Sequence, residues 1–361
     1  VPPYNTVLGF ASMLGEDGRP MHKSWGNSIE FNEGADKIGV DVMRWTFLRH
    51  NPERNLLFGY KMAGETKRQF HMMLWNSFRF FINNALLDEY VYKTPKNLSE
   101  NVLDKWVLLR LDEVCKTVTA SLEKYDAATA TLALEKFVAD LSTWYIRRSR
   151  DRVGPTSIDK SDKEACYDTL YQVFLTLSCL LMPFTPFISD LLYTNLTGKK
   201  SVNSADWPKL KTPLSDDSGL ITRMQLVRQI CELGHSARKT AGIAVKQTLS
   251  SMTIHGSSGI ESLTPVILLE LNLEKLIYEP GNDLSVSLDT KLTPALIAKG
   301  KTREIIRSLQ QARKDALCRL DEVVEATIPD WPDEYEDEIK QKTLVAKLTK
   351  GEALTIIRHN K

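Results

Sequence analysis

The sequence has 361 residues, of which 42% are hydrophobic and 26% charged, a composition typical of folded globular proteins and outside the range of disordered or fibrous chains. Lysine and arginine total 47 against 46 for aspartate and glutamate, so a nucleic-acid partner would have to be recognised by a local basic patch and not by net charge. Every apolar run is interrupted far short of the roughly 20 residues that a membrane span needs, and we expect no membrane contact.

The spacing of the cysteines and the first residues of the chain indicate the class of protein. The five cysteines lie far apart and none forms a C-x-x-C pair, so the sequence predicts neither a zinc site nor a disulfide framework. We therefore expect no metal site, and the thiols indicate a cytoplasmic protein. The chain begins at Val1 without a charged-then-apolar signal segment, and we expect it to be part of a longer protein.

The first two hundred residues are predicted to form a strand, a loop and a helical bundle. Residues 6–14 are apolar and β-prone, and 15–18 have turn composition. Apolar residues then recur at three- and four-residue spacing, which predicts four amphipathic helices. These helices cover 66–87, 107–122, 134–145 and 170–181. We expect the prolines of 182–187 to kink the last helix or break it in two, and the aromatic residues Trp75, Trp106, Phe78, Phe80 and Phe81 to pack in the core.

The remaining residues change from bundle-like to mixed periodicity. Residues 197–218 have linker-like composition and precede a helix that carries apolar residues from Leu226 to Ala237. Strands are predicted at 251–255, 276–278 and 284–288, and helices at 260–271, 294–317 and 331–357. Thr293-Pro294 is a typical helix start, because threonine caps and proline suits the first helical position. The predicted fold class is mainly α, with a small α/β domain at the C-terminus.

A nine-residue loop carries several groups that suit phosphate binding. It reads Arg19-Pro20-Met21-His22-Lys23-Ser24-Trp25-Gly26-Asn27. The Lys23 ammonium is a compact cation, and the flexible backbone around Gly26 lets amides approach phosphate oxygens closely. Composition alone favours the alternative of a solvated hairpin turn.

Arginines crowd the end of the third predicted helix, next to Trp144 and Tyr145. They are Arg147, Arg148, Arg150 and Arg152. Guanidinium groups bind phosphates and an aromatic ring can stack on a base, so the segment is a candidate RNA-binding surface. The alternative is that the rings are core and the arginines solvate the helix end. Arg238, Lys239 and Lys246 form a weaker basic cluster, for which an ordinary solvated helix end is at least as good an explanation.

Several motifs resemble class I aminoacyl-tRNA synthetases. The loop, with Ile29-Glu30 and residues 35–45 after it, is similar to the Lys-Met-Ser-Lys-Ser region of that class. Residues 140–150, 182–187, 201–208, 241–247 and 292–294 resemble isoleucyl-tRNA synthetases in the same order, and the run from Trp144 to Arg150 discriminates best against valyl and leucyl relatives. The resemblance covers nearly the whole chain except the last thirty or so residues.

The resemblance implies an enzyme that activates isoleucine with ATP and Mg²⁺ and transfers it to its tRNA. It implies that Lys23, Ser24 and His22 act at the reacting phosphates. It also implies that Met21, Lys23, Gly26 and Asn27 bind the nucleotide. The RNA contacts would come from Trp144, Arg147, Arg148, Arg150, Arg152, Arg238, Lys239 and Lys246. We expect a monomer.

The chain departs from the family pattern in the loop. Pro20 stands where the family usually has its first lysine, His22 stands in place of the central serine, and Trp25 takes a position that is more often leucine. The His-x-Gly-His signature and any G-x-x-x-x-G-K-[ST] loop are absent from the sequence. We therefore expect the isolated chain to bind no cofactor and to activate no amino acid.

The resemblance assigns a role to each predicted segment. Residues 1–50 would be the end of the catalytic domain, 51–200 the helical anticodon-binding bundle, 201–248 a linker with a connecting helix, and 249–361 the small α/β domain. The alternative is a stand-alone RNA-binding or scaffolding protein that has lost the enzyme. A His-x-Gly-His motif upstream of Val1 would favour the enzyme.

Overall fold

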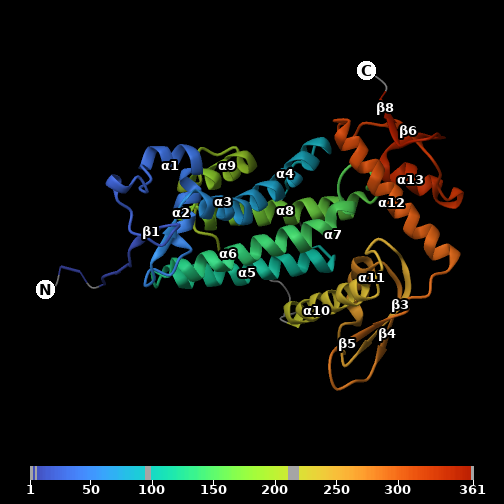
Figure 1. Cartoon of the computed structure of the whole chain (residues 1–361), viewed down its shortest axis with the longest axis horizontal. Helices are drawn as coiled ribbons and strands as arrows, with labels where there is room; N and C mark the ends of the chain where they lie inside the picture. Colours follow the sequence, from blue (N-terminus) through green and yellow to red (C-terminus); the bar gives the residue numbers. More distant parts are fainter. Residues whose placement is uncertain (1–2, 5, 94–98, 210–218, 359–361) are drawn as a thin grey trace. The chain divides into compact units, whose positions relative to one another are not determined.

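The computed structural model describes residues 3–4, 6–93, 99–209 and 219–358. These residues fall in two compact units. The first unit comprises Val1–Val153 with Asp159–Leu214, and the second comprises Gly154–Ile158 with Ser215–Lys361. Figure 1 shows the elements of both units coloured along the sequence. Each unit is described separately below.

The first unit begins with a small parallel strand pair. Strands β1 (Met13–Gly15) and β2 (Leu56–Phe58) pair directly, and helices α1 (Phe31–Ile38) and α2 (Val40–Leu48) lie between them in sequence. The strand predicted over 6–14 is therefore wrong except at its end. Within the described chain, the residues before β1 have no partner strand, and the side chain of Phe10 is 83% exposed.

The predicted helical bundle is confirmed. Its helices are α3 (Tyr60–Thr66), α4 (Met72–Leu87), α5 (Val102–Leu122), α6 (Ala127–Asp140), α7 (Arg147–Ser149), α8 (Lys160–Leu181) and α9 (Pro186–Thr197). Short π-helical turns at Lys67–His71 and Leu141–Ile146 join α3 to α4 and α6 to α7 without a break. Trp106, Phe78 and Phe81 are buried as predicted, whereas Trp75 and Phe80 are half-buried. The chain breaks between α8 and α9 at the predicted prolines.

The second unit contains two three-stranded sheets with helices. Helix α10 (Gly219–Thr240) precedes β3 (Leu249–His255), α11 (Thr264–Leu271), β4 (Leu273–Glu279) and β5 (Ser285–Leu288). Helix α12 (Pro294–Asp315) precedes β6 (Val324–Ile328), α13 (Glu336–Thr343), β7 (Val345–Lys350) and β8 (Thr355–Ile357). The strand orders are β4-β3-β5 and β7-β6-β8. The three strands predicted between 251 and 288 are confirmed.

Two predictions for the second unit are wrong. Helix α10 packs against β5 and α11, so it belongs to the α/β unit and the predicted boundary at 248 is misplaced. The helix predicted over 331–357 is a short helix followed by two strands. Ile339, Val345 and Leu348 fall near helical spacing and pack in one core. They belong to different elements, however, because Leu344 adopts a left-handed conformation that ends α13.

The start of α12 agrees with the sequence. The Thr293 hydroxyl accepts a hydrogen bond from the amide of Leu296, and Pro294 occupies the first helical position, as predicted. Over the part of the chain that the structure describes, no helix is long and apolar enough to cross a membrane.

Candidate functional site

The loop of residues 19–27, called the signature loop below, is closed by Asn27. The Asn27 side-chain amide donates to the carbonyl of Pro20 at 3.0 Å and its oxygen accepts from the amide of His22 at 2.9 Å. Between these contacts Lys23–Trp25 form one 3-10 turn, which ends at Gly26 with φ of 70°. An L-residue rarely adopts this φ, so the glycine is required for the turn. The hydrogen bonds of Asn27 and the turn at Gly26 therefore define the shape of the loop.

The side chains of the signature loop divide into exposed and anchoring groups. His22, Lys23 and Ser24 are exposed, so the groups predicted to meet phosphates face solvent. Met21 instead packs against the core formed by Ile38, Val42, Met43, Phe58 and Ala63. Met21 and Asn27, which we predicted to bind the nucleotide, thus hold the loop itself in this structure, and any contact of theirs with a nucleotide stays a prediction.

Two departures from the family pattern contact one another. The rings of His22 and Trp25 meet edge to face with centroids 4.4 Å apart, an arrangement that aromatic pairs favour. Trp25 remains 60% exposed despite this contact. The imidazole and the indole therefore act as a pair, and replacing either ring also changes the surroundings of the other.

Glu16 fixes the segment before the signature loop to the bundle. Its Oε1 accepts a hydrogen bond of 2.7 Å from the amide of Met62 in the first turn of α3. Such a contact satisfies one of the amides that a helix leaves unpaired at its N-terminus. Gly59 makes room for it, because a Cβ at Gly59 would lie 2.2 Å from the Cγ of Glu16.

We expect Gly59→Ala to lower the free energy of unfolding by about 1–2 kcal/mol, since the methyl group displaces Glu16 and removes a helix cap. Gly64→Ala in the same helix is the matched control. A Cβ at Gly64 meets nothing within 4 Å, and alanine is the better helix former, so this variant should be as stable or more stable. Urea denaturation measures both, and equal effects would contradict the role of Glu16.

Helix α2 holds the segment that contains the signature loop on the bundle through Asp41, Arg44 and Trp45. The Asp41 carboxylate accepts from the amides of Phe187 and Ile188 at the start of α9, and burial raises its pKa although these hydrogen bonds oppose the shift. The Arg44 guanidinium donates to the carbonyls of Pro183 and Phe184 at 2.8 and 3.0 Å.

Trp45, one helical turn after Asp41 in α2, adds to this contact. Its side chain is fully buried, its indole N–H donates to Glu135 at 2.8 Å, and its ring stacks on Phe70 with centroids 3.8 Å apart. Asp41, Arg44 and Trp45, which lie within the residues 35–45 that resemble a synthetase motif, therefore hold the signature-loop segment on the helices.

The segment Arg147–Arg152, called the arginine turn below, contains two exposed arginine residues. These are Arg147 and Arg150. The guanidinium carbon of Arg148 lies 3.8 Å from the ring centroid of Trp144, a cation–π contact. Trp144 is 6% exposed and Tyr145 is fully buried. The ring that we expected to stack on a base is therefore buried beneath an arginine, and the core alternative describes Trp144.

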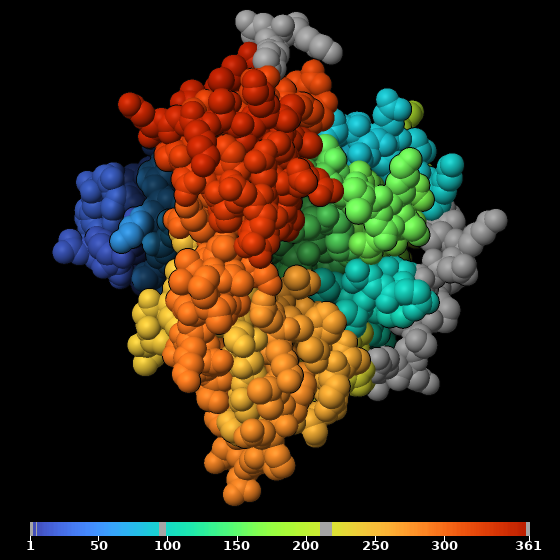
Figure 2. All heavy atoms as spheres, turned by 90° about the vertical axis from the view of Figure 1, so that its right-hand side faces the viewer, coloured from blue at the N-terminus to red at the C-terminus, as the bar shows by residue number. Residues whose placement is uncertain are grey.

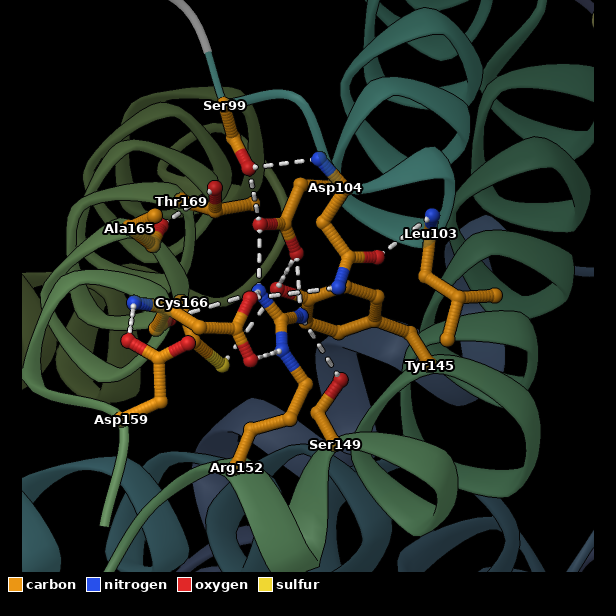
Figure 3. A network of polar contacts seen from close by, with 12 residues as sticks. Ser99, Leu103, Asp104, Tyr145, Ser149, Arg152, Asp159, Ala165, Cys166 and Thr169 are labelled. Atoms are coloured by element: carbon orange, nitrogen blue, oxygen red, sulfur yellow. Dashed lines mark hydrogen bonds and ion pairs between the residues drawn. The ribbon is translucent and has the colours of Figure 1, made fainter. Parts of the chain in front are cut away.

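Arg152 is not available to RNA, contrary to the prediction. Its guanidinium donates to both oxygens of Asp104 at 2.6 and 2.8 Å, a contact that can be followed in Figure 3. It also donates to both oxygens of Asp162 at 2.8 Å. Asp104 is fully buried, and it also accepts from the hydroxyls of Tyr145 and Ser99 at 2.6 Å. The network joins α5, the arginine turn and α8.

Two helix caps set the carboxylates of this network in place. Asn101 caps α5 three residues before Asp104, and Asp159 caps α8 by accepting from the amide of Asp162. Hydrogen bonding to Arg152 lowers the pKa of Asp162, so that carboxyl group is stabilised in its charged form. The direction of the arginine turn is thereby fixed from inside the bundle.

The weaker basic cluster also loses a predicted RNA contact. Arg238 is fully buried and donates to backbone carbonyls, including those of Ala244 at 3.2 Å and Gln247 at 2.9 Å. Lys246 pairs with Glu304, and Lys239 is exposed. Of this cluster, Lys239 alone keeps the exposed position that we expected of all three.

Sequence reasoning missed the acidic residues that organise the site. Asp104 was detectable, because it is a charged residue on the apolar face of a helix that also carries Val107 and Leu111. A buried carboxylate requires a cationic partner, which points to the arginines. Glu16 and Asp41 have no such signal, since their partners are backbone amides far away in sequence.

Comparisons with known proteins bear directly on this bundle. Residues 104–253 match the family described as the anticodon-binding domain of tRNA ligase. The isoleucine–tRNA ligase of Dehalococcoides mccartyi strain 195 is 35% identical over 98% of this chain, and that of Thermus thermophilus is 32% identical over 87%. The chain spans 38% and 31% of the length of these two relatives.

Among solved structures, a Mycobacterium tuberculosis methionyl-tRNA synthetase in complex with methionyl-adenylate aligns with a TM-score of 0.43 and 20% identity, over 50% of this chain and 36% of that one. So partial an alignment adds nothing to the family assignment, which rests on the sequence matches. The chain therefore matches the family of anticodon-binding domains of tRNA ligases in residues 104–253 and is similar to isoleucine–tRNA ligases over 98% of its own length.

Proposed function

We propose that this chain is the tRNA-binding, C-terminal part of an isoleucine–tRNA ligase and that its partner is isoleucine tRNA. The family match over residues 104–253 carries the proposal, because the helices of the first unit within that range hold the arginine turn. The full enzyme would activate isoleucine with ATP in the cytoplasm and esterify it to the tRNA, acting as a monomer.

The arginine turn would bind the RNA backbone. The exposed guanidinium groups of Arg147 and Arg150 match phosphate oxygens in geometry and charge. Arg152 would contribute indirectly, by holding the turn between Asp104 and Asp162. A turn already fixed before binding loses less conformational entropy when RNA binds, which favours affinity.

The signature loop would serve the activation step. Lys23 would stabilise the negative charge that develops on pyrophosphate as the isoleucine carboxylate displaces it from ATP, with Ser24 and His22 beside it. Its cationic and hydroxyl groups suit phosphate oxygens. We expect no isoleucine-dependent exchange of pyrophosphate into ATP by the isolated chain.

The proposal is tested by the salt dependence of tRNA binding. Each phosphate contact releases counterions, so Arg147→Ala and Arg150→Ala should each weaken binding of isoleucine tRNA and reduce the slope of log affinity against log salt by about 0.7. Arg54→Ala, an exposed arginine in the segment before β2, removes the same charge elsewhere and should change neither quantity. Unchanged affinity and slope in both turn variants would remove the arginine turn from the RNA-binding surface.

A further inference from the structure

A polar pocket lies beside helix α12 in the second unit. Its walls come from the start of the first sheet, the middle of α12 and the residues around the start of α13, and its volume is about 230 Å³. Figure 2 shows the two sheet regions of this unit one above the other, the first in gold and orange and the second in red. We call this cavity the α12 pocket.

Arg303 of α12 lines this pocket as a half-buried cation. Its guanidinium donates to the hydroxyl of Thr248, a residue that is 3% exposed. The charge of Glu338 acts on Arg303 from the opposite wall, but that carboxylate pairs with Lys342 at 3.2 Å. An arginine side chain has five N–H donors in a rigid fork, so one contact with Thr248 leaves most of them for a ligand.

A second cation lies close to Arg303. Arg238 is fully buried and donates to the carbonyl of Gln247 at 2.9 Å, one residue before the threonine that Arg303 contacts. Within the described residues, its Nε has no hydrogen-bond partner. Burial and the charge of Arg303 lower the pKa of Arg238 to about 10, so both guanidinium groups are charged at neutral pH and repel one another.

The other charges at the α12 pocket are already neutralised. Lys299 pairs with Glu274, and Lys342 pairs with Glu338. Over the part of the chain that the structure describes, neither Arg238 nor Arg303 has a carboxylate at ion-pair distance. Charges withdrawn from water require a counterion, so the surroundings of the pocket favour an anion.

The donors on the pocket wall suit a phosphate group. The planar fork of Arg303 matches two phosphate oxygens, and the hydroxyls of Thr248 and Tyr335 are further donors on the same cavity. The volume of about 230 Å³ lies below the roughly 300–1,000 Å³ of sites that enclose a drug-sized molecule. A free phosphate, or the terminal phosphate of a small molecule, therefore fits the space.

We propose that the α12 pocket binds a phosphate group, with Arg303 as its main contact and the hydroxyls of Thr248 and Tyr335 as additional donors. The site is separate in sequence from the signature loop and from the arginine turn. Its ligand is inorganic phosphate or a small phosphomonoester, and its binding does not rest on the function proposed above.

Isothermal titration calorimetry of the whole chain with inorganic phosphate, at constant ionic strength, tests the proposal. One phosphate should bind per α12 pocket, and Arg303→Met should weaken this binding at least about tenfold, because a charge-assisted contact is removed. Arg307→Met is the matched control. Arg307 is exposed one turn later on α12, so this variant removes the same charge from the same helix and should leave the affinity unchanged.

Tyr335→Phe and Thr248→Val make the test independent of a folding defect in Arg303→Met. Each removes one hydroxyl at nearly constant size and should weaken phosphate binding about three- to tenfold, the scale of one hydrogen bond. Valine is compatible with the fold at this place. Val323 lies ten residues after Arg313 and directly before the central strand β6, as Thr248 lies ten residues after Arg238 and directly before the central strand β3.

Methyl phosphate in place of inorganic phosphate distinguishes the two sources of the ligand, and saturable binding of either that Arg303→Met weakens supports the site. Absence of saturable binding, or affinity that Arg303→Met and Tyr335→Phe leave unchanged, would overturn the proposal. An equal loss with Arg307→Met would also overturn it, by assigning the effect to the charge of the helix. Loss of the same binding in Arg147→Ala would do so too, by moving the phosphate to the arginine turn.

Discussion

Replacing Arg152 with methionine is expected to lower the free energy of unfolding by about 3–5 kcal/mol, the scale for removing one partner of a buried ion pair. Asp104 is fully buried and accepts two hydrogen bonds from Arg152, so its carboxylate would lose its counterion. Arg150→Met is the matched control. Arg150 is exposed, and its replacement should change stability by less than about 0.5 kcal/mol.

Urea denaturation at several pH values separates this explanation from a general packing loss. The folded-state pKa of Asp162 is lowered by its hydrogen bonds with Arg152, so this carboxyl group stabilises the fold above its unfolded pKa. That contribution is lost as the pH falls through the lowered folded pKa. In Arg152→Met the larger part of this contribution, which comes from Arg152, should be absent, whereas the part from the hydrogen bond of Asn101 remains. Equal destabilisation by Arg150→Met, or an unchanged acid dependence, would contradict the role of the network.

The second large effect concerns Lys23 in the full-length ligase of which we propose this chain to be a part. Lys23→Ala should lower the rate of adenylate formation by about 10²-fold or more, because one preorganised charge is removed from a developing anion. Ser24→Ala and His22→Ala should each cost less, since both leave the Lys23 ammonium in place. The His22 ring also contacts Trp25, so His22→Ala tests loop shape as well as chemistry.

Pre-steady-state measurement of adenylate formation checks this order. Lys23→Arg is a useful companion variant, because it keeps a positive charge at the same position while changing its shape. It should retain more activity than Lys23→Ala. A larger loss with His22→Ala than with Lys23→Ala would show that the main charge had been assigned to the wrong residue.

Much of the fold could be predicted from the sequence where the signal is local. The helices of the bundle have long apolar stripes, and Thr293-Pro294 carries its own cap, so both were found. The helix predicted over 331–357 is wrong because the apolar residues of a short helix and of the strand after it together fall near helical spacing. What separates the two elements is the left-handed conformation of Leu344, a non-glycine residue that gives no warning in the sequence.

The sequence predicted which residue types form the candidate site, but not which of their side chains are exposed. Arg147, Arg150 and Arg152 look alike in the sequence, yet the first two face solvent and the third lies between carboxylates of two other helices. Asp104 is 48 residues from Arg152, so no local pattern links them. Arg238 was misjudged for the same reason, because its partners are backbone carbonyls that any sequence provides.

The most direct test of the central claim is the affinity of the chain for isoleucine tRNA compared with the same tRNA carrying a changed anticodon, measured at one fixed salt concentration. Recognition of anticodon bases through hydrogen bonds to their edges predicts a loss of about 1–3 kcal/mol for each base whose contact is removed, or roughly 5- to 150-fold in affinity. Equal affinity for the two RNAs would contradict the claim that this chain reads the anticodon.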